Sequence, residues 1–279
     1  MRSKITGNYL IRTSKLDLVT TFKNYVVKSR HSYVDSRSLE QNLFLMSSPL
    51  LPLAVLLIYL YFIYRLGPRL MQNREPFELK GILIAYNLTQ IVVNAFIVYA
   101  AFKEVWFNIN WHCEKIGYGR DPHSIYILKM YHLFLMTKLA DLLETVFFVL
   151  RKRQRQITFL HVYHHFGMFL IIWITVRFVA GGYNTWVGLI NSAVHTIMYT
   201  YYFLSSLDEK WKQNVTFKKF ITQIQLVQFS FFIFIFGRQL FVQCGYPKLL
   251  SMFFVPQNFF MLVLFSDFYR RAYLKKPVA

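Results

Sequence analysis

Long apolar stretches separated by short basic segments dominate the pattern along this chain. Stretches without Asp, Glu, Lys or Arg cover residues 41–64, 81–102, 156–176, 178–207, 220–237 and 249–266. Each is close to or longer than the ~18–20 residues that cross the hydrocarbon core of a bilayer as a helix. The pattern therefore predicts a membrane-spanning helix in each of these stretches.

Another apolar segment, residues 125–150, is interrupted by charge. It contains Lys129, Lys138, Asp141 and Glu144. Ionisable groups in a membrane helix are costly, and they face the interior of a helix bundle or a polar cavity. We predict that this segment is a further membrane helix, third in chain order, with its polar face turned inward.

The expected fold is all-α, a polytopic membrane protein with seven transmembrane helices. The transmembrane domain occupies residues 41–268, and no second domain is expected. Residues 1–40 form an N-terminal segment, in which apolar spacing over residues 18–26 predicts an amphipathic helix on the membrane surface. Residues 269–279 form a C-terminal tail.

Charge and composition support this fold and predict an orientation. The chain is 55% hydrophobic and yet has a formal net charge of +19. Lys and Arg lie in short runs between apolar stretches, so they do not indicate a nucleic-acid-binding surface. The most basic loops follow the first, third and fifth helices and the last helix, and the more basic side of a membrane protein is cytosolic. We therefore predict a cytosolic C-terminus and an N-terminus across the membrane, although the basic N-terminal segment favours the opposite.

The chain has two cysteines, which are too few for a disulfide scaffold or a metal cage. Cys113 falls between the second and third helices, and Cys244 between the sixth and seventh. Both loops lie on the non-cytosolic side of the predicted topology, where oxidation is permitted. A Cys113–Cys244 disulfide is one hypothesis, and two unpaired thiols are the alternative.

Candidate catalytic side chains concentrate on the third, fourth and fifth helices. They are Asp141, Glu144, His161, His164, His165 and His195. The three histidines of the fourth helix stand at positions i, i+3 and i+4, so they share one helical face. At ~1.5 Å rise per residue, all of these groups fall in the cytosolic half of the membrane. We predict one site to which three helices contribute.

Three interpretations of this histidine face remain open. Membrane di-iron desaturases and hydroxylases use such histidine boxes, but they use several, and the other histidines here form no second box. Buried histidines bonded only to their neighbours are a second interpretation. The favoured one is nucleophilic catalysis, in which a neutral imidazole attacks a thioester while the nearby carboxylates fix its tautomer. Arg151 and Arg153 would then hold phosphates, although basic loops also occur in any membrane protein that follows the charge rule.

Taken in order, the motifs resemble those of the very-long-chain fatty-acid elongases. The resemblance runs from about residue 35 to residue 273, and its hallmark is the box His-Val-Tyr-His-His at residues 161–165. Further matching positions are residues 35–37, 45–49, 67–71, 74, 76–77 and 79–80, then Asn191, Ser192, His195, Met198, Tyr199, Tyr201, Tyr202, Thr222, Gln223, Gln225, Gln228 and Phe229. One motif departs from the family. The usual K-x-x-E-x-x-D-T is here Lys138, Asp141, Glu144 and Thr145, with the two acids exchanged.

The resemblance implies a ping-pong condensation of long-chain acyl-CoA with malonyl-CoA in the endoplasmic reticulum membrane, with the N-terminus lumenal. His164 would be the acylated nucleophile, with His195 close to the reacting centre. A tunnel among the helices would hold the acyl tail, and its closed end would measure chain length. No metal and no cofactor are implied. Expected partners are the two CoA thioesters, membrane lipid, a second copy of the chain and other enzymes of the elongation cycle.

The resemblance also implies a set of side chains that contact substrate. They are Lys138, Arg151, Arg153, Gln156, Asn191, Tyr201, Lys218, Thr222, Gln225 and Tyr273. A membrane di-iron fatty-acid desaturase or hydroxylase is the alternative enzyme, and iron content distinguishes it. A seven-helix receptor or transporter would share the fold, but it gives no reason for three histidines to face two acids.

Overall fold

The computed structural model describes residues 43–108, 121–242 and 248–274 of the chain. These residues form helices and contain no β-strand, which confirms the prediction of an all-α protein. In chain order the elements are α2 (Leu50–Tyr61), η1 (Phe62–Leu66), α3 (Gly67–Met71), α4 (Lys80–Phe107), α5 (Pro122–Leu150), η2 (Gln154–Gln156), α6 (Phe159–Phe178), η3 (Gly182–Asn184), α7 (Thr185–Leu207), α8 (Glu209–Gln213), α9 (Val215–Phe241), α10 (Lys248–Tyr269) and η4 (Arg270–Leu274).

Within the described residues, five helical stretches are long and apolar enough to cross a membrane. They are the continuous run Leu50–Met71, then α4, α6 and α9, and the run Lys248–Leu274. They confirm the prediction of a polytopic membrane protein. α5 and α7 have 29 and 23 residues, but both carry more polar side chains. Seven membrane spans therefore remain a prediction.

The first helix differs from its predicted bounds at both ends. Residues 43–49 form turns, with Leu45 at a φ of 69°, and the helix begins at Leu50 instead of residue 41. Pro49 and Pro52 explain the later start, because proline lacks a backbone N–H and is tolerated only near a helix start. The helix then continues through a π-helical turn, past Arg65, to Met71. An arginine ends an uncharged stretch, but it does not end a helix.

Side-chain caps set the starts of the two helices that carry most of the candidate site. At α5, Asp121 Oδ1 accepts hydrogen bonds from the backbone N–H groups of His123 and Ser124 at 3.1 and 3.0 Å. Hydrogen bonds from the Ser124 hydroxyl and N–H lower the pKa of the Asp121 carboxyl. At α6, Thr158 Oγ1 accepts from the backbone N–H of His161 at 3.2 Å. Each helix thus begins at a favoured N-cap residue.

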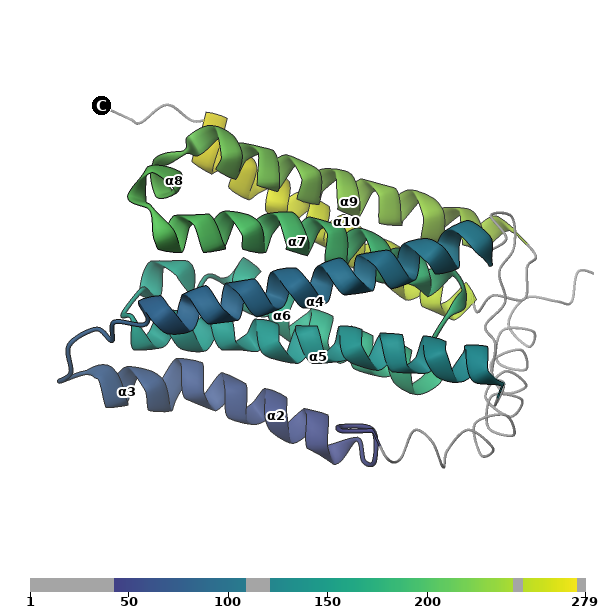
Figure 1. Ribbon diagram of the computed structural model, residues 1–279, viewed down its shortest axis with the longest axis horizontal. Helices are drawn as coiled ribbons and strands as arrows, with labels where there is room; N and C mark the ends of the chain where they lie inside the picture. The colour runs from purple at the N-terminus through teal and green to yellow at the C-terminus, as the bar shows by residue number, and fades with distance from the viewer. Residues whose placement is uncertain (1–42, 109–120, 243–247, 275–279) are drawn as a thin grey trace, which may run out of the picture.

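The long helices close into a ring. Contacts run from α5 to α4, then to α7, α9, α10 and α6, and back to α5. The first helical run lies outside this ring, where α2 packs on α6 and α3 packs on α5 (Figure 1). α5 has neighbours on three sides, which explains how a helix with four charged residues stays inside the protein.

Gly67 allows the close approach of α3 to the end of α5. A Cβ at this position would lie 2.6 Å from Val149 Cγ1 and 2.9 Å from the Phe62 carbonyl oxygen. We expect Gly67→Ala to lower the free energy of unfolding by about 1–3 kcal/mol through overpacking, seen as a lower thermal midpoint in detergent. Gly81→Ala is the control, because a Cβ there meets no heavy atom within 4 Å. Equal midpoints for the two variants would contradict this packing.

Candidate active site

The polar face of α5 is buried inside the bundle. Lys138, Asp141, Glu144 and Thr145 expose 2%, 3%, 9% and 0% of their surfaces. Their spacing places them along one side of the helix. Buried polar and charged groups require partners, and the partners of these four side chains come from α2, α4, α6 and α7.

Asp141 is hydrogen-bonded on both carboxylate oxygens. Its Oδ2 accepts from Lys138 Nζ at 3.0 Å. Its Oδ1 accepts from Gln90 Nε2 at 2.7 Å and from the Tyr199 hydroxyl at 2.8 Å. One charged and two neutral donors together offset the cost of burying this carboxylate.

His195 of α7 joins the same group. Its Nδ1 lies 3.5 Å from Lys138 Nζ and 3.7 Å from Asp141 Oδ2. A lysine ammonium can only donate, so His195 Nδ1 accepts and the ring proton belongs on Nε2. We call Gln90, Lys138, Asp141, His195 and Tyr199 the anchor cluster.

The second acid faces the histidines of α6. Glu144 Oε2 lies 3.5 Å from His165 Nε2, and the rings of His161 and His165 are 4.2 Å apart. Thr145 Oγ1 lies 2.8 Å from His161 Nε2 and 2.8 Å from the Tyr59 hydroxyl of α2. We call Tyr59, Glu144, Thr145, His161 and His165 the box cluster. About one turn of α5 separates it from the anchor cluster.

His164 differs from the other two histidines of the box. Its ring packs edge-on against His165 and Phe265, with centroids 5.6 and 6.2 Å away. The ring is half-buried, and its nitrogens make no hydrogen bond within the described part of the chain. A ring nitrogen without a protein partner is available to an incoming electrophile.

Several buried side-chain oxygens on these and the neighbouring helices have no hydrogen-bond partner among the described residues. Glu144 Oε1, Asn191 Oδ1 and Gln228 Oε1 are among them. Most buried polar atoms in folded proteins are paired, so unpaired ones indicate places where water or a ligand binds. Glu144 therefore has one carboxylate oxygen facing His165 and the other left for a further donor.

Glu144, His161 and His165 could together hold one metal ion. One ligand atom from each lies within 4.8 Å of the others. No second group of this kind is found over residues 43–108, 121–242 and 248–274. A di-iron centre needs more ligands than these three residues supply.

Most of the side chains expected to contact substrate lie at or near one end of the bundle, where the α5–α6 and α7–α9 connections and η4 gather (Figure 1). These residues belong to the connections themselves, to η4 or to the adjoining turns of α7 and α9, and they are Arg151, Arg153, Gln156, Tyr201, Lys218, Thr222, Gln225 and Tyr273. Lys138 and Asn191 lie deeper, and both are buried. Partial burial and the charge of Arg153 lower the pKa of Arg151, but guanidinium groups start from so high a value that it stays cationic.

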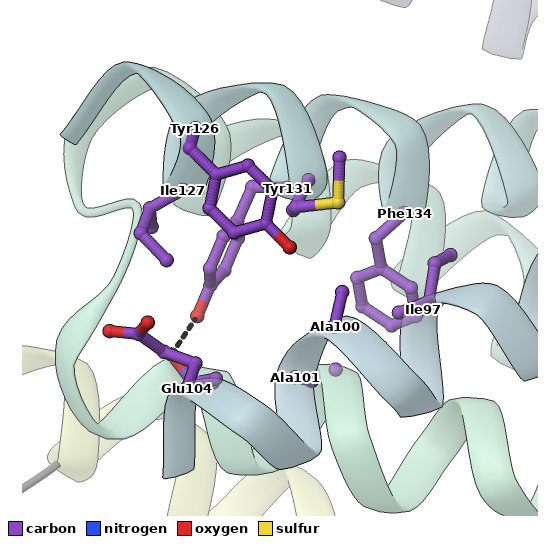
Figure 2. A pocket seen from close by; sticks show the side chains of 11 residues that line it. Ile97, Ala100, Ala101, Glu104, Tyr126, Ile127, Tyr131 and Phe134 are labelled. Carbon is purple, nitrogen blue, oxygen red and sulfur yellow. Dashed lines mark hydrogen bonds between the residues drawn. The ribbon is translucent and has the colours of Figure 1, made fainter. Parts of the chain in front are cut away.

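An apolar pocket lies toward the other end of the bundle, between α4, α5 and α7. Figure 2 shows Ile97, Ala100 and Ala101 of α4 opposite Tyr131 and Phe134 of α5. The Tyr131 hydroxyl lies 3.3 Å from Thr185 Oγ1 of α7. Phe134 also touches the anchor cluster, because Lys138 Nζ lies 4.9 Å from its ring centroid. The pocket therefore begins about one turn of α5 beyond the candidate catalytic groups.

Sequence reasoning missed Gln90 and Tyr86 of α4 and Tyr59 of α2. Gln90 and Tyr59 bind the α5 face directly, and the Tyr86 hydroxyl lies 3.2 Å from that of Tyr199. A usable signal existed for Gln90, since Asn87, Gln90 and Asn94 repeat with helical spacing in an otherwise apolar stretch.

Two predictions fall on other parts of the chain. The Cys113–Cys244 pair and the amphipathic helix at residues 18–26 lie outside the described residues.

Comparison with known proteins gives a consistent result. Residues 44–279 match the ELO family, described as the GNS1/SUR4 family. The mouse protein named very long chain fatty acid elongase 1 is 37% identical over 235 residues, covering 83% of this chain and 84% of the relative. Human elongase 4 is 34% identical over 276 residues (95% and 86%). An elongase of the mosquito Aedes aegypti is 35% identical over 251 residues (88% and 70%).

Proposed function

Because this chain belongs to the ELO family, whose matched members are named very long chain fatty acid elongases, we propose that it catalyses the condensation step of fatty-acid elongation. Long-chain acyl-CoA and malonyl-CoA would give 3-oxoacyl-CoA, carbon dioxide and CoA. The observation that carries this proposal is the convergence on the α5 face of His161 and His165 from α6 and His195 from α7, with His164 packed beside His165. Such a set of buried imidazoles and carboxylates suits acyl transfer.

The first half-reaction is acylation of His164. A neutral ring nitrogen attacks the thioester carbonyl, the C–S bond breaks, and the proton of the imidazole N–H leaves with CoA as its thiol. His164 is assigned this role because its ring nitrogens have no partner within the described part of the chain, whereas Thr145 binds His161 and Glu144 faces His165. The box cluster would hold the neighbouring rings and polarise the thioester.

The second half-reaction consumes malonyl-CoA. Its carboxylate leaves as carbon dioxide, and the electron pair of the broken C–C bond forms an enolate. The enolate carbon attacks the acyl-imidazole, a new C–C bond forms, and the imidazole leaves and regains a proton from solvent. Balanced in this way, the reaction needs no redox cofactor and no metal. Donors aimed at the enolate oxygen would stabilise the developing charge.

The cationic end of the bundle suits the CoA portion of both substrates. Arg151 and Lys218 are half-buried there, and Arg153 is exposed. Guanidinium and ammonium groups bind phosphate strongly when water is partly excluded. In the proposed orientation this end faces the cytosol, the membrane is that of the endoplasmic reticulum, and the N-terminus is lumenal. A second copy of the chain and the reductase and dehydratase enzymes of the cycle are the proposed partners.

The pocket between α4, α5 and α7 is the proposed site for the end of the acyl tail. At Gly188, which lines it, an added Cβ would meet no heavy atom within 4 Å. We expect Gly188→Leu to shorten the longest product by about one two-carbon cycle or more, because the new side chain occupies space meant for the tail. Product chromatography over a panel of acyl-CoA lengths measures this. Gly237→Leu on α9 also has open space but lies outside the pocket, and it should leave product length unchanged.

Radiolabelled malonyl-CoA tests the proposed function itself. Purified protein supplied with long-chain acyl-CoA should release labelled carbon dioxide when the free carboxyl carbon carries the label. It should form a labelled 3-oxoacyl product when the other carbons of the malonyl group carry the label.

A metal enzyme is the second candidate, because one ligand atom from each of Glu144, His161 and His165 could bind the same ion. Bound iron at stoichiometric amounts, with no malonyl-CoA consumed, would favour that candidate.

A further inference from the structure

The two acids of α5 lie one turn apart in different surroundings. Asp141 accepts three hydrogen bonds, one of them from a lysine. Glu144 lies opposite His165, and its Oε1 has no partner among the described residues. Asp141 is therefore saturated by protein groups, whereas Glu144 keeps a free acceptor. Acids that differ in this way are suited to different tasks.

Gln90 is the neutral group that holds Asp141 from α4. Its side chain is 3% exposed, and Nε2 donates to Asp141 Oδ1 at 2.7 Å. The other side of the amide is also held, because Asn94 Nδ2 lies 3.4 Å from Gln90 Oε1. Contacts at both ends keep the amide directed at the carboxylate, so Gln90 helps to orient Asp141 together with Lys138 and Tyr199.

The orientation of Asp141 determines that of two further groups. Its Oδ2 accepts from Lys138 Nζ, which lies 3.5 Å from His195 Nδ1, and that Nδ1 is 3.7 Å from the same Asp141 oxygen. With Nδ1 as the acceptor from Lys138, His195 carries its ring proton on Nε2. Lys138 and His195 are thus two positive or proton-bearing groups fixed on one side of the site. The box cluster lies about one turn further along α5, and His164 packs beside its His165.

We infer that Gln90 is a positioning residue for the second half-reaction: through Asp141 it holds Lys138 and His195 where the enolate oxygen of the decarboxylated malonyl thioester forms. Glu144 and the box cluster serve the acylation of His164 instead. This inference rests on the proposed function. Breaking the C–C bond to the carboxylate places its electron pair on the enolate, and fixed donors lower the energy of that charge. No part of this assignment requires Gln90 to touch substrate.

Rapid-quench measurement of the two half-reactions tests this division. Acyl-enzyme formation is followed with acyl-CoA alone, and condensation is followed when malonyl-CoA is added to preformed acyl-enzyme. In Gln90→Leu we expect acylation within about 3-fold of the wild-type rate. Condensation should fall by about 10–100-fold, since small displacements of positioned groups cost rates of this order. Equal slowing of both steps, or of neither, would overturn the assignment.

Two other variants separate positioning from loss of structure. Asn87→Leu makes the same kind of change one turn earlier on α4, where the amide lies 3.4 Å from Ser206 Oγ instead of Asp141. It should leave both half-reactions unchanged. Gln90→Met keeps the length of the buried side chain and removes only the amide that donates to Asp141, so it should reproduce the selective loss of condensation even if Gln90→Leu fails to fold. A selective loss of acylation in Gln90→Met would contradict the inference.

The wild-type protein distinguishes failure of the inference from failure of the proposed function. If wild-type protein forms no acyl-enzyme and consumes no malonyl-CoA, the proposed function is wrong. If it does both, and the variants show no selective effect on condensation, only the positioning role of Gln90 is wrong.

Discussion

We expect His164→Ala to lower the rate of condensation by about 10³-fold or more while the protein stays folded. The reason is that the acyl group would lose its covalent acceptor, and the histidines on either side are held by Thr145 and Glu144. The half-buried ring makes no hydrogen bond within the described residues, so its removal should cost little stability. The measurements are product formation from radiolabelled malonyl-CoA and the thermal midpoint in detergent.

His123→Ala is the matched control for this variant. His123 is exposed at the start of α5 and lies 2.9 Å from Glu104, at the opposite end of the helix from the candidate site. It should retain full activity. If His164→Ala also kept most of its activity, the nucleophile would have to be a different group.

The second large effect is expected at Asp141. Asp141→Ala removes the buried acid that Lys138 binds at 3.0 Å, and the remaining lysine is only 2% exposed. An uncompensated buried charge destabilises a protein by about 3–5 kcal/mol. We expect a correspondingly large drop in the thermal midpoint, together with loss of activity.

A double variant separates the charge effect from the loss of side-chain volume. Lys138→Met/Asp141→Leu removes both charges and should recover much of the midpoint, but no activity. Lys129→Ala, at an exposed position on the same helix, should leave the thermal midpoint and the activity unchanged. If Asp141→Ala were as stable as the wild type, Lys138 would have another partner in that variant or would be reached by water.

Most helices could be predicted from the sequence because charged residues separate the apolar stretches that form them. The cap at Asp121 and the loop after residue 150 place α5 close to its expected bounds of 125–150. The first helix was misplaced because the absence of charge says nothing about backbone geometry. Pro49 delays its start, and the helix continues past Arg65 to Met71.

The candidate site was predictable where ionisable side chains carried it. Spacing alone put the three histidines on one face, and burial of charge required Lys138 and Asp141 to face inward. The contributions of Gln90 and Tyr59 were not predicted, because neutral amides and phenols are common on membrane helices. Only the structure shows that these two bind Asp141 and Thr145. The separate surroundings of Asp141 and Glu144 could not be read from spacing either, since both lie on the same face of α5. Packing of α4 and α6 against that face makes the difference.

Peptide mapping by mass spectrometry, after incubation with long-chain acyl-CoA in the absence of malonyl-CoA, tests the covalent role of His164 most directly. We expect an acyl adduct on His164 that is released as 3-oxoacyl-CoA when malonyl-CoA is added. An adduct on another residue that is chased into product, or condensation at full rate through no covalent intermediate, would contradict this role.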